Sequence, residues 1–137
     1  MGNAQWISCL ITNATGVELK INKASLSWGK FYSDPNNKNS EIPPSALEGV
    51  SIPIGGQYTF NSCGRNGTSS GTEGHVYLAV AGTQIVDIYW SVPWGSSSNI
   101  FTPTVTSGPY YANIVGTVPQ DGPIGNIGCK VGAAAES

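Results

Sequence analysis

Apolar and polar residues alternate in short runs along this chain, and turn-forming residues separate the runs at intervals of about ten residues. At Val17, Leu19 and Ile21, for example, apolar residues stand two apart with polar residues between them. This pattern turns one face of a β-strand toward a core and the other toward water. It predicts an all-β fold, a single-domain sandwich of two sheets of short antiparallel strands that spans residues 1–137. The predicted strands are Ala4–Thr12, Val17–Asn22, Ala24–Tyr32, Gln57–Ser62, His75–Ala81, Thr83–Trp90, Ser98–Thr106, Tyr110–Gly116 and Ile124–Val131.

The segments between these runs predict the connections. We expect Asn13–Gly16 to turn the first strand back onto the second as a hairpin, and Ala81-Gly82 to close a tight hairpin. Two longer segments, Ser33–Ser40 and Cys63–Gly74, are polar and rich in turn residues, so we expect loops there. One helical turn is expected at Ser45–Glu48, where two prolines suit a helix start.

The composition excludes several classes of protein. Glycine and proline account for 18 and 9 of the 137 residues, which leaves no room for long helices. Charged residues make up 10% of the chain and the net charge is −2, so we expect no positive field that could hold nucleic acid or an anionic membrane. No run approaches the ~20 apolar residues of a membrane-spanning helix, and the first residues do not have the pattern of a secretory signal.

Residues suited to catalysis or metal binding are scarce. The cysteines Cys9, Cys63 and Cys129 are widely spaced, and no two have the close spacing of ligands in a structural zinc site. We expect buried thiols, although one pair could form a disulfide. His75 could act as a base with Cys63 and Asp87, yet nothing in the sequence brings the three together, and the motif G-x-S-x-G is absent. We therefore predict a protein that is not an enzyme and that holds no metal or cofactor.

Aromatic residues carry the strongest functional signal. Most lie beside Gly, Pro or polar neighbours at the ends of predicted strands: Trp6, Trp28, Tyr32, Tyr89, Trp90, Trp94, Tyr110 and Tyr111. They can fill a small core, or several can lie together on one rim of the sandwich and enter the headgroup layer of a membrane. Such a rim could hold the ammonium group of a choline or ethanolamine headgroup by cation–π attraction, while Lys30 or Arg65 pairs with the lipid phosphate.

Four motifs resemble the aegerolysin family, in the family's order and spacing. They are Gln5-Trp6, Ser27-Trp28-Gly29-Lys30, Ser62-Cys63-Gly64-Arg65 and Tyr89-Trp90-Ser91-Val92-Pro93-Trp94-Gly95-Ser96. The resemblance extends from the N-terminus to about Thr106 and implies a small acidic β-sandwich. It also implies a protein made in the cytoplasm without a signal peptide, released by a non-conventional route, and acting on the membranes of target cells.

The resemblance implies a lipid-binding function. Aegerolysins bind membranes rich in particular sphingolipids, either sphingomyelin with cholesterol or ceramide phosphoethanolamine. Many members then recruit a larger protein of the membrane-attack-complex/perforin class, and the pair forms a transmembrane pore. The resemblance assigns membrane contact to Trp6, Trp28 and Trp94. The chemistry of the side chains adds Lys30, Arg65, Trp90, Tyr110 and Tyr111 to the predicted lipid-binding set.

The chain also departs from the family pattern. Ser91 and Val92 stand where many members have Asp and Cys, and the acidic residue near the glycine-rich loop falls at Glu73. Two other functions are open to a sandwich of this kind. One is a carbohydrate-binding module, because exposed Trp and Tyr also stack on sugar rings. The other is a self-contained pore former, although the sequence shows no long amphipathic hairpin pair that could span about 25 Å of hydrocarbon.

Overall fold

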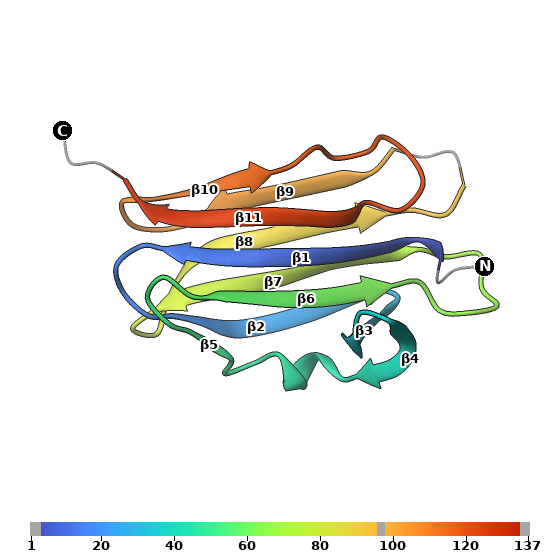
Figure 1. The fold of residues 1–137 in the computed structure, drawn as a ribbon, viewed down its shortest axis with the longest axis horizontal. Helices are drawn as coiled ribbons and strands as arrows, with labels where there is room; N and C mark the ends of the chain where they lie inside the picture. Colours follow the sequence, from blue (N-terminus) through green and yellow to red (C-terminus); the bar gives the residue numbers. More distant parts are fainter. Residues whose placement is uncertain (1–3, 96–97, 135–137) are drawn as a thin grey trace.

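The computed structural model describes residues 4–95 and 98–134, which form two facing β-sheets (Figure 1). The strands are β1 Trp6–Ala14, β2 Leu19–Trp28, β3 Lys30–Asp34, β4 Asn37–Ile42, β5 Ser51–Ile52, β6 Gln57–Cys63, β7 Thr72–Val80, β8 Thr83–Val92, β9 Ile100–Val105, β10 Tyr110–Val115 and β11 Gly125–Ala133. The start of the chain at Met1 and the last residue of the fourth motif, Ser96, lie outside the described residues.

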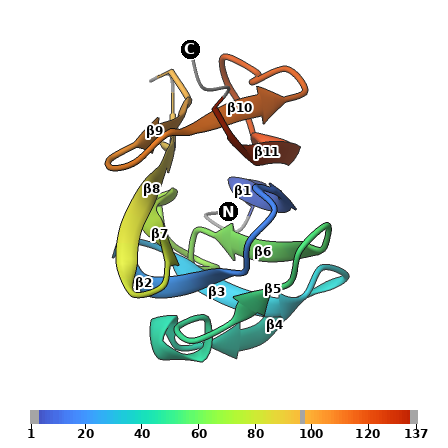
Figure 2. The same ribbon diagram turned by 90° about the vertical axis from the view of Figure 1, so that its left-hand side faces the viewer.

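The strand order defines the two layers. One sheet has six strands in the order β10-β11-β1-β6-β3-β4, and the other has five in the order β5-β2-β7-β8-β9. Figure 2 shows β2, β7 and β8 on one side of the molecule and β1, β6 and β11 on the other. The predicted fold class, an all-β sandwich, is confirmed. Within the described residues, no helix is long and apolar enough to cross a membrane.

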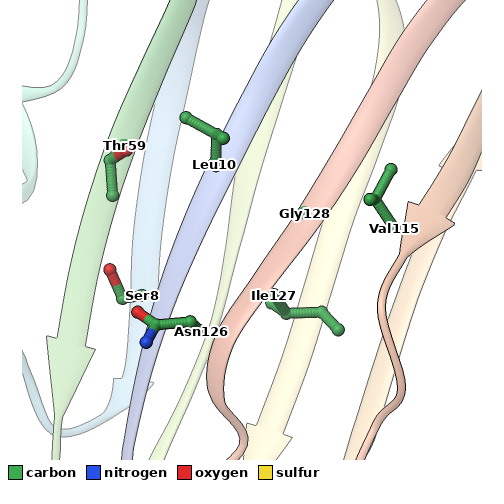
Figure 3. A pocket seen from close by; sticks show the side chains of 7 residues that line it. All are labelled: Ser8, Leu10, Thr59, Val115, Asn126, Ile127 and Gly128. Atoms are coloured by element: carbon green, nitrogen blue, oxygen red, sulfur yellow. The ribbon is translucent and has the colours of Figure 1, made fainter.

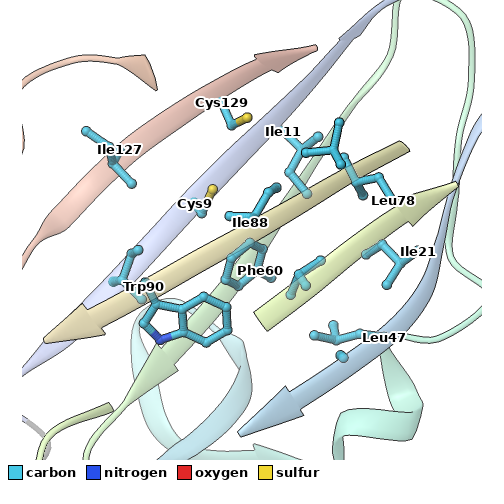
Figure 4. Close-up of a cluster of buried hydrophobic side chains, with 14 of the residues drawn as sticks. Cys9, Ile11, Ile21, Leu47, Phe60, Leu78, Ile88, Trp90, Ile127 and Cys129 are labelled. Carbon is cyan, nitrogen blue, oxygen red and sulfur yellow. The ribbon is translucent and has the colours of Figure 1, made fainter. Parts of the chain in front are cut away.

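Trp90 lies in the core between the sheets. Figure 4 shows it beside Phe60, and the two ring centroids are 5.1 Å apart. The centroid of the Phe31 ring lies 5.8 Å from that of Trp90. Its indole N–H donates to the Thr72 hydroxyl oxygen at 3.1 Å, and this oxygen lies 2.6 Å from the Ser62 hydroxyl. The burial of this large ring therefore leaves no polar atom unsatisfied. Trp90 is fully buried, so the prediction that it belongs to an exposed rim is wrong.

The three cysteines are free and buried, as expected. Cys9 and Cys129 project from the neighbouring strands β1 and β11 into the core (Figure 4). Burial raises the pKa of the Cys129 thiol to about 12, and burial together with Cys129 raises the pKa of Cys9 well above its ordinary value. Both thiols therefore stay protonated and unreactive. Among the described residues, no group of three His, Cys, Asp or Glu side chains could hold a metal ion.

The predicted hairpin between the first two strands is wrong. β1 pairs with β6 and β11 in the six-stranded sheet, whereas β2 pairs with β5 and β7 in the other sheet. The pairing of β1 with β11 is parallel, so the expectation of antiparallel strands throughout is wrong at this place. The segment between β1 and β2 therefore crosses from one sheet to the other. The Asn13 side-chain amide holds this segment across the end of the sandwich, because it donates to the carbonyl oxygens of Val17 at 2.7 Å and Ile52 at 2.9 Å.

A second change of sheet occurs at Gly29. The predicted strand Ala24–Tyr32 is divided here, since β2 ends at Trp28 in one sheet and β3 begins at Lys30 in the other. Gly29 has φ +90°, and a Cβ at this position would lie 2.5 Å from the Cys63 carbonyl oxygen. Only glycine combines this backbone conformation with so close an approach.

Two predicted loops contain strands. Within Ser33–Ser40, β3 and β4 form a hairpin that turns at Pro35-Asn36, and only the turn itself agrees with the predicted loop. Within Cys63–Gly74, β7 already begins at Thr72. Polar residues suit these places because β4 is an edge strand and the side chains of β7 alternate between core and solvent. The expected helical turn is a short 3₁₀ helix, η2, at Pro44–Ala46.

The two ends of the sandwich differ in their residues. We call the end where β1 begins and β2 and β8 finish the tryptophan end, because Trp6, Trp28 and Trp94 lie there (Figure 1). β10 begins at the opposite end, since Tyr110 pairs with Ala133 and the neighbouring Gly132 pairs with Ala14 at the other end of β1. Eight residue steps of β1 separate the two ends, which corresponds to about 26 Å at about 3.3 Å per residue.

Candidate functional site

Trp28 and Trp94 line one pocket of about 220 Å³ at the tryptophan end. Trp28 is the last residue of β2 and is 60% exposed, and Trp94 follows β8 and is 37% exposed. Between them the pocket is lined by polar side chains of the outer face of the five-stranded sheet and of the loop before β7, including Ser70, Glu73 and Ser91. We call this pocket the Trp28–Trp94 pocket.

Close packing and hydrogen bonds place Trp94 at this pocket. A Cβ on Gly71 would overlap the Val92 carbonyl oxygen, so only glycine lets the loop before β7 lie against the turn that carries Trp94. On the other side of the turn, the side-chain amide of Gln5 donates to the Pro93 carbonyl oxygen at 2.7 Å. The backbone carbonyl of Gln5 accepts from the Gly64 N–H at 3.0 Å. The buried Gln5 therefore joins three segments of the tryptophan end.

Glu73 gives the pocket its charge. It lies opposite Trp28 on one side and Ser91 on the other, and its carboxylate accepts a hydrogen bond from the Tyr89 hydroxyl. The hydrogen bond to Glu73, followed by burial, raises the pKa of the Tyr89 phenol, which therefore stays a donor to this carboxylate. Among residues 4–95 and 98–134, Arg65 forms a salt bridge with Glu41 and His75 contacts Asp87, and Glu73 takes part in neither pair.

Trp6 and Lys30 lie near the same end but belong to strands of the six-stranded sheet, and Arg65 lies in the loop after β6. None of the three lines the Trp28–Trp94 pocket. Trp6 is half-buried, and the Lys38 ammonium lies 5.3 Å from its ring centroid. The predicted pairing of Lys30 with a phosphate at an aromatic cage is wrong for this pocket, because the Lys30 side chain is 7% exposed on the outer face of another sheet.

Arg65 forms a salt bridge with Glu41. Its guanidinium donates two hydrogen bonds to the carboxylate, at 3.0 and 2.8 Å, and both side chains are largely exposed. The guanidinium is thus already engaged, and its predicted contact with a lipid phosphate stays a prediction.

We expect Glu41→Gln to lower the free energy of unfolding by at most about 1 kcal/mol, because exposed ion pairs contribute little. The Arg65 hydrogen bond lowers the pKa of Glu41 below its ordinary value of 4.5. The contribution of Glu41 is therefore complete above that value and is lost as the pH falls through the lower pKa of the folded state. Denaturant titrations of both proteins from neutral pH to pH 3 would measure it. A difference that grows toward low pH would contradict the assignment.

Tyr110 and Tyr111 are not part of the tryptophan end. Tyr110 packs against the core at the opposite end, and the Tyr111 ring covers Gly132 of β11, where no larger residue would fit. The prediction that both tyrosines share a rim with the tryptophans is wrong. Their pattern in the sequence, two aromatic residues after a Gly-Pro turn, does not reveal which end of the sandwich the turn occupies.

The structure brings together one pair that the sequence left apart. His75 Nδ1 lies 2.7 Å from Asp87 Oδ1, and the His75 ring stacks on Tyr77. Cys63, the candidate nucleophile, is buried at the end of β6 in the other sheet. Burial raises the pKa of its thiol in spite of nearby cations. The three residues therefore do not form a catalytic group.

A second hollow lies on the outer face of the six-stranded sheet (Figure 3). It is a shallow groove of about 370 Å³ with Leu10 and Val115 in its walls and Gly128 beneath them. Its lining contains no charged side chain and none of the predicted site residues. The Trp28–Trp94 pocket is therefore the better candidate for a site that recognises a polar ligand.

The sequence matches the Aegerolysin family over residues 4–134. The chain belongs to the aegerolysin family. Asp-hemolysin of Aspergillus fumigatus is 38% identical over 130 residues, which are 94% of this chain and 93% of that protein. Aegerolysin Aa-Pri1 of Cyclocybe aegerita is 35% identical over 127 residues, 90% of this chain and 87% of that protein.

Solved structures agree with this assignment. The structure of RahU protein in complex with a TRIS molecule superposes with a TM-score of 0.91 at 29% identity and covers 98% of this aegerolysin and 99% of that chain. The family and the names of these relatives support the predicted general class of function, that of a lipid-binding protein related to cytolysins.

Some residues of the pocket were missed by sequence reasoning. The sequence singled out Glu73 only as a displaced acid, and it gave Ser70 and Ser91 no binding role. A signal was present for Glu73, because it stands two residues before His75, and residues two apart in a strand share one face. The pairing of Glu73 with Trp28 could not be predicted from the sequence, because these residues are far apart in the chain and belong to strands that meet only in the folded sheet.

Proposed function

We propose that this aegerolysin binds membranes that contain sphingolipids and that the Trp28–Trp94 pocket receives the lipid headgroup. One observation supports this above the others. Two exposed indoles flank a pocket that contains a carboxylate without a cationic partner among the described residues. Indole rings favour the headgroup layer of a bilayer, and a carboxylate beside them attracts an ammonium group.

The charge of the protein agrees with a zwitterionic target. The net charge is −2, and Arg65, near the tryptophan end, is paired with Glu41. Long-range attraction to an anionic membrane would require an excess of basic side chains. Binding would therefore depend on short-range contacts of the headgroup with Trp28, Trp94 and Glu73, and would change little with salt.

Co-sedimentation with vesicles tests the proposal. We expect binding to vesicles of sphingomyelin with cholesterol, or of ceramide phosphoethanolamine, and none to vesicles of phosphatidylcholine alone. A blue shift of the tryptophan emission should accompany binding, because the exposed indoles leave water. If no sphingolipid vesicle is bound, with or without sterol, the proposal is wrong. Binding to glycans in the absence of lipid would instead favour a carbohydrate-binding module.

We further propose that the bound protein is the lipid-reading component of a two-component cytolysin. It would act at the surface of target cells and recruit a larger protein of the membrane-attack-complex/perforin class. Vesicles loaded with dye distinguish this role from that of a self-contained pore former. The aegerolysin should release no dye alone and should do so when a perforin-class partner is added. Release by the pure protein would contradict the two-component proposal.

A further inference from the structure

The basic residues of this chain are unevenly distributed. Three of the six, Lys30, Lys38 and Arg65, gather around the end of β6, and we call them the basic cluster. Burial raises the pKa of the Cys63 thiol there, and the charges of all three cations oppose this shift. Set against Glu41, the three cations leave an excess of two positive charges on this surface, although the whole chain has a net charge of −2.

Strand pairing forms the floor of the basic cluster. Cys63 of β6 lies between Trp6 of β1 and Lys30 of β3, in one row across the six-stranded sheet. Ile7 and Phe31, the next residues along β1 and β3, point into the core. Because successive side chains of a strand point to opposite faces, the row lies on the outer face of this sheet. It is therefore separated from the five-stranded sheet by the core.

The β3–β4 hairpin and the loop after β6 cover this row. The Lys38 ammonium lies 5.3 Å from the Trp6 ring centroid, although β6 and β3 separate β4 from β1 in the sheet. The hairpin therefore folds over the outer face. Arg65 in the loop after β6 closes the cover, because its guanidinium holds Glu41 of β4. Lys30 lies beneath these segments and is 7% exposed.

The Lys30 ammonium is the buried charge of the basic cluster. It takes part in neither of the two salt bridges found among residues 4–95 and 98–134. Glu41, the acid on which the Lys30 charge acts, receives a hydrogen bond from Arg65 on each of its two oxygens. A buried charge costs free energy unless an opposite charge or hydrogen bonds compensate for it. The cluster thus has the charge and the burial to hold a small anion.

We propose that the basic cluster binds a phosphate group, through Lys30 and Lys38 from the sheet and Arg65 from the loop. A guanidinium matches the oxygens of a phosphate with two parallel donors, and each ammonium adds a compact charge. The phosphate belongs to an anionic lipid of the bound membrane or is free in solution, since both present the same oxygens. The site goes beyond the proposed function, because it is separate from the Trp28–Trp94 pocket.

Glu41 competes with the phosphate for Arg65. Both side chains of this salt bridge are largely exposed, and an exposed ion pair contributes little free energy. A bound phosphate can therefore take over donors of Arg65 at small cost. Glu41→Gln removes the competing charge and should raise the affinity for phosphate about threefold. Lys30→Met keeps the length of the buried stem and should lower the affinity about tenfold, as the loss of one charge-assisted hydrogen bond would.

Titration with inorganic phosphate tests the site without a membrane. The chemical shift of the Trp6 indole N–H should move as phosphate binds, because this ring is in contact with Lys38. Lys130→Met is the matched control for Lys30→Met, since Lys130 is exposed on β11 and pairs with Thr12, away from the basic cluster. It should leave the affinity for phosphate unchanged.

Vesicles show whether the phosphate comes from a lipid. Binding is compared on vesicles of sphingomyelin and cholesterol with and without a small fraction of phosphatidic acid, whose phosphate is exposed at the bilayer surface. Phosphatidic acid should tighten binding of the wild type and of Lys130→Met several-fold, and that of Lys30→Met much less. The gain should shrink at high salt. Binding of inorganic phosphate with no gain from phosphatidic acid would keep the site and identify its ligand as a free phosphate.

The outcomes separate this site from the proposed function. If inorganic phosphate does not bind and phosphatidic acid brings no gain, the phosphate site is wrong. It is also wrong if Lys130→Met loses as much affinity as Lys30→Met, because the effect is then one of general charge. If the wild type binds no sphingolipid vesicle, the proposed function is wrong, and the phosphate titration still decides about the site. Thermal melts show whether each variant is folded.

Exposed residues keep the test valid if Lys30→Met does not fold. Arg65→Gln and Glu41→Gln change only side chains that are largely exposed, and they should move the affinity for phosphate in opposite directions. Equal affinities of these two variants for phosphate would overturn the site.

Discussion

Replacing Trp90 with alanine should lower the free energy of unfolding by about 3–5 kcal/mol. The ring is fully buried and packs against Phe31 and Phe60, so its removal leaves a large cavity between the sheets. It also removes the donor to the Thr72 hydroxyl. Because a domain of this size is stabilised by only about 5–15 kcal/mol, the variant should lose a large fraction of its stability and unfold at a much lower denaturant concentration than the wild type. Denaturant titration monitored by circular dichroism measures the loss.

Trp90→Phe distinguishes packing from hydrogen bonding. Phenylalanine retains most of the apolar contacts but cannot donate to Thr72, so we expect a loss of about 1–3 kcal/mol. If Trp90→Ala unfolds at the same denaturant concentration as the wild type, the Trp90 ring does not stabilise the core, and the assignment of Trp90 to the core is wrong.

Replacing Trp28 with alanine should weaken binding to sphingolipid vesicles about tenfold and change the free energy of unfolding by less than about 1 kcal/mol. The ring is 60% exposed, so little packing is lost. Full burial of a large apolar side chain contributes about 1.5–3 kcal/mol, and partial entry into the headgroup layer contributes somewhat less. Trp94→Ala should act in the same way, and the double variant should lose binding about a hundredfold if the two effects add.

Ile54→Ala is the control for this pair. Ile54 is 66% exposed and lies near Gly55 and Gly56, which bond to Asn13 at the end opposite the tryptophans. The substitution Ile54→Ala removes exposed apolar surface away from the proposed site, so vesicle binding should not change. Co-sedimentation and thermal melts of all four variants provide the comparison. If Trp28→Ala binds as tightly as the wild type, or if Ile54→Ala loses as much, the membrane does not meet the protein at the tryptophan end.

The two tryptophans of the fourth motif show that the sequence did not predict which aromatic side chains are exposed. Trp90 and Trp94 are four residues apart and have similar neighbours, and both were predicted to lie on an exposed rim. Trp90 is on the inner face of β8 together with Ile88 and Val92, whereas Trp94 follows the end of this strand. The sequence showed that side chains alternate along β8, but the face of β8 that packs against the other sheet depended on strands elsewhere in the chain.

Glu73 and Lys30 show the same limit for charged residues. Lys30 is adjacent to the exposed Trp28 in sequence, yet Gly29 sends it into the other sheet, where it is 7% exposed. Glu73 was expected in a loop, yet it is in β7 and faces Trp28 across a strand pair. Proximity in sequence therefore predicted the wrong partner, because Trp28 and Glu73, which meet at the pocket, are 45 positions apart in the chain.

The sequence by itself determined the class of fold, the scarcity of catalytic groups and the family, because alternation, composition and short motifs are local properties. The tertiary structure alone decided which aromatic rings meet solvent, which acid lies beside them and which end of the sandwich carries the site. The reason is that strand pairing and the face a strand presents are set by packing between distant segments. A one-residue change of register or a crossing at a single glycine moves a side chain from one surface of the molecule to another.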